Sequence, residues 1–76
     1  MRGMASIRER FGKAVRRLRE GAGYSQEGFA AVAGIHRTYY SKIERGLANV
    51  TIEVAERIAK ALRLSLGKLF AAVDSE

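Results

Sequence analysis

The sequence predicts an all-α domain, a compact bundle of five short helices, and three observations support this prediction. Apolar residues recur at three- and four-residue spacing, whereas no window shows the strict alternation of a half-buried strand. The 76 residues include no proline, and Ser, Thr or Gly marks most ends of the periodic windows. Cysteine is also absent, so neither a disulfide nor a thiolate zinc site can add stability. We expect one domain, residues 1–76, near the lower size limit for a self-sustaining core.

The first helix is expected from Ser6 to Gly21. Ser6 and Glu9 have the S-x-x-E spacing of a capping box, in which hydroxyl and carboxylate each accept from a backbone amide. The predicted buried stripe is Ile7, Phe11, Ala14, Val15 and Leu18. The opposite side carries Arg8, Arg10, Lys13, Arg16 and Arg17. These cations are interpreted as a solvated face, with electrostatic support for a bound polyanion as the alternative.

Two short helices joined by a glycine turn are expected next. Ser25 is the predicted N-cap of the second helix. The inward positions on the two helices are Phe29, Ala30, Ala33, Tyr40, Ile43 and Leu47. Gly34 can adopt the positive φ that a sharp turn requires. Counted from Gln26, the spacing is that of a DNA-binding helix-turn-helix over residues 26–45, with residues 36–45 as recognition helix.

The outer face of the third helix differs from an ordinary surface helix. It presents Arg37, Thr38, Ser41, Lys42 and Arg45, with Tyr39 at its edge. Such a face suits an anionic partner that also carries hydrogen-bond donors and acceptors. The hydroxyl of Tyr40 requires a partner in the core or must emerge at its edge. His36 is expected to be an ordinary surface histidine, because no second metal ligand lies nearby.

A fourth and a fifth helix complete the predicted bundle. Thr51 is the expected N-cap of the fourth, whose apolar stripe is Val54, Ile58, Ala61 and Leu62. Its solvated side carries two i,i+4 pairs, Glu53 with Arg57 and Glu56 with Lys60. Ser65 caps the fifth helix, and residues 65–73 are more apolar than a short terminal helix needs. The apolar residues there, either core closure or a two-fold dimer interface, are Leu66, Leu69, Phe70 and Val73.

The distribution of charge separates the chain into two halves. The net charge is +6, and residues 1–45 hold ten Lys and Arg against four acids, whereas residues 46–76 hold four against four. This asymmetry indicates nucleic acid or an anionic surface as partner. No apolar run is long enough to span a bilayer, and the start lacks a signal-peptide core, so a cytoplasmic location is expected. Met4 offers a second candidate start beside Met1.

Several short strings resemble the phage-repressor (Cro/CI-like, XRE) helix-turn-helix family. They are Ser25-Gln26-Glu27, Gly34-Ile35, Arg37-Thr38-Tyr39, Ser41, Ile43-Glu44-Arg45-Gly46 and Leu66 to Phe70. With Asn49 and Thr51-Ile52, the chain is most similar to the controller proteins of restriction–modification systems. The resemblance implies a lambda-repressor-like bundle that binds a palindromic operator as a homodimer and regulates transcription from its own promoter.

The resemblance also implies roles for individual residues. Base-reading is expected of Arg37, Thr38 and Lys42, and contacts to the DNA backbone of Gln26, Tyr39, Ser41, Arg45 and Asn49. Arg19 and Glu44 would form a structural pair that ties the recognition helix to the first helix. An arginine near a helix N-terminus can donate two hydrogen bonds to guanine, and phosphate contacts position the helix.

Functions of other classes predict different features. An antitoxin-type regulator or protein-interaction module would use the apolar fifth helix to dock a partner protein. Membrane-surface binding by the first helix conflicts with the use of its apolar stripe in the core. An enzyme is not expected, because the chain has a single histidine, no convergent pair of carboxylates and no glycine-rich phosphate loop. No cofactor, metal or small-molecule ligand is expected.

Overall fold

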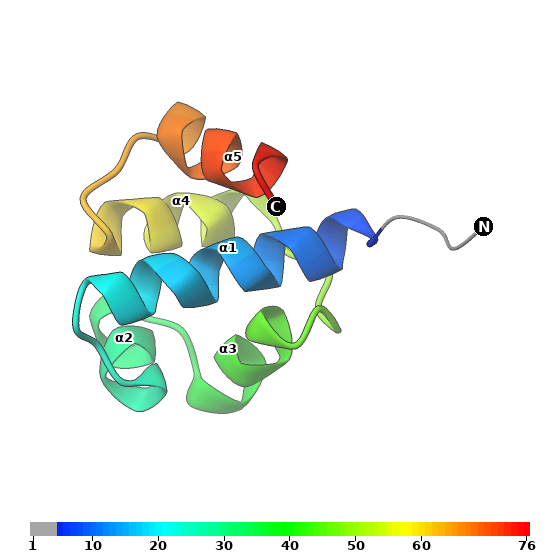
Figure 1. Ribbon diagram of the computed structural model, residues 1–76. Helices are drawn as coiled ribbons and strands as arrows, with labels where there is room; N and C mark the ends of the chain where they lie inside the picture. The colour runs from blue at the N-terminus through cyan, green and yellow to red at the C-terminus, as the bar shows by residue number, and fades with distance from the viewer. Residues whose placement is uncertain (1–4) are drawn as a thin grey trace.

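The computed structural model describes residues 5–76, which form five helices connected by short turns (Figure 1). In chain order they are α1 (Ile7–Gly21), α2 (Gln26–Ala33), α3 (Arg37–Glu44), α4 (Ile52–Ala61) and α5 (Leu66–Asp74). No strand occurs in this part of the chain, which confirms the predicted all-α class and the number of helices. Both candidate starts, Met1 and Met4, lie outside the described residues.

The helices begin where the sequence predicts, because hydroxyl side chains cap their free amides. Oγ of Ser6 accepts from the Glu9 amide at 3.1 Å, and the Glu9 carboxylate accepts from the Ser6 amide at 2.9 Å. This is the predicted capping box. Ser25, Thr51 and Ser65 likewise accept from the amide three residues later. The four predicted N-caps are therefore confirmed.

The core lies where α1 crosses the other helices. In Figure 1, α1 runs through the middle of the molecule, with α4 and α5 on one side and α2 and α3 on the other. It packs against α5 and α3, while α2 contacts both α3 and α4. The largest fully buried side chains are Tyr40, Phe29, Ile43, Ile58, Leu69, Val15 and Val73. The ring of Phe29 lies 5.4 Å from that of Tyr40, so the two helices of the predicted helix-turn-helix share one apolar centre.

The turn between α2 and α3 depends on a left-handed glycine. Gly34 has φ 71° and ψ 34°, a conformation that a residue with a Cβ adopts only with strain. Directly after it, the Ile35 amide donates to the Ala30 carbonyl oxygen at 2.9 Å, which closes the end of α2. The chain then enters α3 after only three residues. Gly34 thus sets the angle at which α3 leaves α2.

A second glycine allows α1 and α3 to approach closely. A Cβ on Gly12 would lie 2.4 Å from the carbonyl oxygen of Ile43 and 2.7 Å from that of Glu44. Both neighbours are backbone atoms and cannot rotate away, so only glycine fits without a shift of the helices. The crossing holds the C-terminal end of α3 against the middle of α1.

Some of the predicted core positions are wrong. Leu47 is 61% exposed, because Gly46 before it has φ 75° and takes the chain out of helical register, so Ala48 is buried instead. Ile7 is 55% exposed, because it is the first residue of α1 and lies a full turn before the core begins at Phe11. The helical period predicts a face only while the helix continues.

The burial and charge pattern of α4 also differs from the prediction. Its buried residues are Ala55, Ile58 and Ala59, whereas Val54, Ala61 and Leu62 are half-buried. Neither predicted i,i+4 ion pair forms within residues 5–76. Instead, Arg57 donates to the Gly34 carbonyl oxygen at 3.3 Å. Exposed pairs of this kind contribute only about 0.3–0.5 kcal/mol, so a nearby carbonyl can compete for the arginine.

Candidate nucleic-acid interface

The outer face of α3 gathers the residues for which base-reading was predicted. Arg37, Thr38 and Lys42 are all exposed, whereas the inner residues Tyr40 and Ile43 are completely buried. Because three of the eight residues of α3 are buried, the orientation of its exposed face is determined by the core. The helix therefore presents a polar, positively charged ridge to solvent.

A shallow depression of about 270 Å³ lies between the start of α2 and α3. Its lining combines predicted base-reading and backbone-contacting residues with one unexpected acid. The lining residues are Gln26, Glu27, Arg37, Thr38, Ser41 and Arg45. The structure thus brings together residues that are up to 19 positions apart and that the resemblance assigned to one DNA-binding surface.

Tyr39 and Asn49 do not line this depression. Tyr39 is half-buried, and its hydroxyl donates to the Asn49 carbonyl oxygen at 3.3 Å. Asn49 is exposed in the loop that follows α3. This hydrogen bond links the loop to α3 through the Asn49 backbone, and Asn49 itself remains exposed to solvent.

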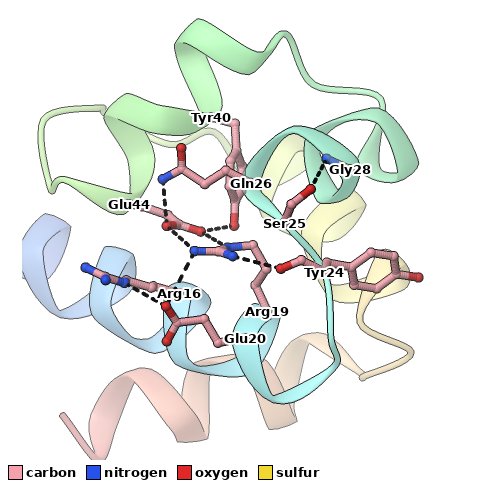
Figure 2. Close-up of polar contacts among 9 residues, drawn as sticks. All are labelled: Arg16, Arg19, Glu20, Tyr24, Ser25, Gln26, Gly28, Tyr40 and Glu44. Atoms are coloured by element: carbon pink, nitrogen blue, oxygen red, sulfur yellow. Dashed lines mark hydrogen bonds and ion pairs between the residues drawn. The ribbon is translucent and has the colours of Figure 1, made fainter.

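The C-terminal end of α3 is fixed by a buried polar network around Glu44 (Figure 2). Arg19 of α1 binds the Glu44 carboxylate with two nitrogens, Nε at 2.6 Å and Nη2 at 3.1 Å. Gln26 at the start of α2 donates its amide to the same carboxylate at 3.0 Å, and the Tyr40 hydroxyl donates to it as well. Arg19 also donates to the Tyr24 carbonyl oxygen at 2.8 Å. Three helices therefore meet at one carboxylate.

The network satisfies every polar group it buries. The side chain of Glu44 is only 2% exposed, and that of Arg19 only 9%. Within residues 5–76, no buried side-chain nitrogen or oxygen lacks a hydrogen-bond partner. A buried ion pair of this kind is favourable only when further hydrogen bonds compensate its burial, and here Tyr40, Gln26 and the Tyr24 carbonyl oxygen supply them. The Tyr40 hydroxyl thus finds its partner inside the core, and Arg19 and Glu44 are in the contact that the resemblance implied.

The network also shifts the protonation equilibria of its members. Burial would raise the pKa of Glu44, but hydrogen bonds from Arg19, Tyr40 and Gln26 outweigh burial and hold the pKa below its ordinary value. The hydrogen bond to Glu44 raises the pKa of Arg19. Burial, followed by the bond to Glu44, raises the pKa of Tyr40. Glu44 is therefore charged and Tyr40 protonated throughout the neutral range.

Gln26 makes a contact in addition to the DNA-backbone contact that was predicted for it. Its side-chain amide nitrogen is bonded to Glu44, while the residue as a whole remains exposed at the N-terminal end of α2. Since an amide group has two N–H donors, one can bind Glu44 while the other remains free to donate elsewhere. Gln26 therefore joins the exposed surface to the buried network.

The geometry of residues 26–45 has counterparts among known proteins. The family model described as helix-turn-helix matches residues 15–69 of the chain. Control protein C.MunI of Mycoplasma sp is 42% identical over 74 residues, which cover 96% of this chain and all of the relative. The crystal structure of the restriction-modification controller protein C.AhdI from Aeromonas hydrophila, 36% identical, has a TM-score of 0.80 over 83% of this chain and 96% of that one.

This chain belongs to the helix-turn-helix family of restriction–modification controller proteins. A further member, C.Esp1396I, has a structure bound to a 19 base pair DNA duplex. It is 30% identical, with a TM-score of 0.85 over 93% of this chain and 95% of that chain. The predicted family and fold are thereby confirmed, and DNA binding is established for a relative of very similar architecture.

Two other features are absent from the described residues of this controller protein. Among the described residues, no three His, Cys, Asp or Glu side chains are grouped so that they could hold a metal ion. None of the helices in residues 5–76 is long and apolar enough to cross a membrane.

An apolar groove of about 290 Å³ lies on another part of the protein surface. It is bordered by the start of α1, by the loop that follows α3, and by α5. It is lined by Ile7, Arg8, Phe11, Ala48, Asn49, Val50, Thr51, Ile52, Ala55 and Phe70. Ile52 is 78% exposed and Phe70 43%, so the groove has apolar walls that reach solvent. The ring of Phe70 lies 6.0 Å from that of Phe11.

The burial of one face of α5 limits which of the predicted dimer-interface residues are accessible. Leu69 and Val73 are 0% and 1% exposed, because one face of α5 closes the core against α1. They cannot meet a second copy without unfolding α5. Leu66 is half-buried, and Phe70 is exposed at the edge of the buried face, with its ring near that of Phe11. Of the four predicted interface residues, Phe70 and Leu66 are the two that reach the surface.

Two contacts of the candidate interface were missed by sequence reasoning. Glu27 lies 2.6 Å from Arg37 across the turn, and its spacing of ten residues has no short-range signature. His36, expected to be an ordinary surface histidine, is the N-cap of α3, and its Nδ1 accepts from the Thr38 amide at 3.1 Å. Its position just before a polar, periodic helix was the available signal.

Proposed function

We propose that this protein is a sequence-specific transcriptional regulator that binds a palindromic operator as a homodimer in the cytoplasm and controls its own promoter. The observation that carries the proposal is the exposed ridge of α3, with Arg37, Thr38 and Lys42 fixed outward by a buried inner face. A helix of this kind fits the major groove, where base edges are distinguishable. The DNA-bound structure of C.Esp1396I supports the same role here.

The test is a gel-shift titration against the DNA upstream of the protein's own gene, with excess random competitor at two salt concentrations. We expect a discrete complex that survives competitor. Replacing Arg37 with alanine should weaken operator binding about tenfold, within the range for a lost bidentate contact to guanine. Lys60→Ala, which removes an exposed cation from α4, serves as control for net charge. Loss of the complex on addition of competitor, in wild type, would refute sequence-specific binding.

The homodimer in this proposal uses the apolar groove rather than the buried face of α5. A second copy could cover Ile52 and Phe70 around a two-fold axis, and a palindromic site requires such an axis. The same groove is the feature that favours the alternative of an antitoxin-type regulator or protein-interaction module, in which a partner protein docks there. Sedimentation distinguishes the homodimer from a monomer that docks a partner protein. If the homodimer forms through this groove, Ile52→Lys should convert the dimer to a folded monomer. A wild-type chain that is monomeric at every concentration would favour the partner protein.

A further inference from the structure

Glu27 is an acid on a surface whose other charged residues, Arg37 and Arg45, are cations. It lies in the first turn of α2 and is the only carboxylate among the described residues that line the depression beside α3. Glu44 of α3 does not face this depression, because its side chain is only 2% exposed. A carboxylate at this position repels phosphates and reduces the positive charge of the surface. Its presence therefore requires an explanation.

The contacts of Glu27 show what it does in the free protein. Its carboxylate oxygen Oε2 lies 2.6 Å from Nη1 of Arg37, and the two side chains are 72% and 69% exposed. A pair this exposed adds little to folding stability. The cap of α2 is supplied by Ser25, so the helix does not need Glu27 for that purpose. The ion pair therefore matters for which donors of Arg37 remain available to a ligand.

The ion pair occupies only part of the guanidinium group. Within the described part of the chain, Arg37 makes no other hydrogen bond with its side chain, so Nη2 and Nε remain available while Nη1 is bonded to Glu27. A guanidinium has five donors in a rigid fork, and guanine offers two acceptors, O6 and N7, to such a fork. A phosphate, by contrast, must compete with the carboxylate for the same charge.

From these contacts we infer that Glu27 is a specificity-determining residue. It positions Arg37 for a contact with guanine, and its negative charge reduces the attraction of Arg37 to phosphates. On DNA of the wrong sequence, the pair stays closed and contributes almost no net charge to binding. At a guanine, the oriented fork makes a bidentate contact. This inference rests on the proposed DNA binding through α3 and adds to it the residue that sets the ratio of specific to non-specific affinity.

The experiment compares Glu27→Gln with wild type on operator and on random-sequence duplexes across a series of salt concentrations. The substitution frees Arg37 for a phosphate, so binding to random DNA should strengthen and its salt slope should steepen by about 0.9, the value for one more phosphate contact. The ratio of operator to random affinity should fall about fivefold to tenfold, within the discrimination carried by one bidentate pair. In Glu27→Gln with Arg37→Ala, the salt slope should return to the wild-type value.

The control is Glu56→Gln, which makes the same charge change on an exposed position of α4, a helix that does not line the depression beside α3. It should shift both affinities by the same factor. The inference is wrong if Glu27→Gln behaves like this control, with the affinity ratio and the random-DNA salt slope unchanged. A wild-type protein that shows no preference for its upstream DNA would instead refute the proposed function, which separates the two failures.

Discussion

The hydroxyl of Tyr40 offers a stringent test of the buried network. Tyr40→Phe removes one donor from the Glu44 carboxylate and keeps the ring, which is completely buried and packs on Phe29. A hydrogen bond to a charged group contributes about 1.5–3 kcal/mol. We expect the lower end, about 1.5 kcal/mol, because the same oxygen still accepts from Arg19 and is not left unpaired. For a domain of this size, that loss corresponds to a fall in Tm of about 6–12 °C.

The assay is urea unfolding at neutral pH followed by circular dichroism, with Tyr24→Phe as matched control. The hydroxyl of Tyr24 makes no hydrogen bond within residues 5–76, and in Figure 2 its ring points away from the network. This control should stay within about 0.5 kcal/mol of wild type, as expected for a surface change. If Tyr40→Phe is no less stable than Tyr24→Phe, the hydrogen bond from the Tyr40 hydroxyl to Glu44 makes no net contribution to the free energy of unfolding, and the reasoning is refuted.

Two further predictions concern the same region. The pKa of Glu44 is lowered in the folded protein, so its contribution to stability is complete above the ordinary value of 4.5 and is lost as the pH falls through the folded value. The acid-induced fall in unfolding free energy should therefore be shallower in Glu44→Gln than in wild type, and parallel pH profiles would contradict this. Gly12→Ala should cost about 2–3 kcal/mol, because its Cβ meets the Ile43 and Glu44 carbonyls. Gly21→Ala, where a Cβ meets no atom within 4 Å, is the control, and equal stability of the two variants would show that α1 and α3 can separate without cost.

The sequence carried enough local information to predict the helices. Ser6, Ser25, Thr51 and Ser65 mark helix starts through contacts with an amide only three residues away, and Gly34 marks the turn through its own backbone. These signals do not depend on the rest of the fold. The family resemblance added the contact between Arg19 and Glu44, which are 25 residues apart and whose meeting no local pattern could predict.

Features that depend on the path of the chain between helices were not predictable. Leu47 has the correct helical spacing but follows a residue with positive φ, so it is exposed. Leu69 and Phe70 are both apolar and adjacent, and only the packing of α5 on α1 shows that Leu69 closes the core while Phe70 faces solvent. Glu27 meets Arg37 because of the angle that Gly34 sets. The pattern of the sequence indicates that Arg37 belongs to the exposed face of α3, but it does not predict that Arg37 pairs with Glu27.

The two ends of α3 are held in different ways, and this difference has a functional consequence. Its C-terminal end is fixed by a buried carboxylate with four hydrogen bonds, whereas Arg37 at its N-terminal end is held by one exposed ion pair. Changes to the buried network should therefore alter stability and weaken binding to every DNA sequence alike. Changes at Glu27 should leave stability nearly unchanged and alter the ratio between sequences. The backbone of the reading helix is thus fixed by the core, while Arg37, the side chain that we expect to read guanine, is positioned by a single exposed contact at Nη1.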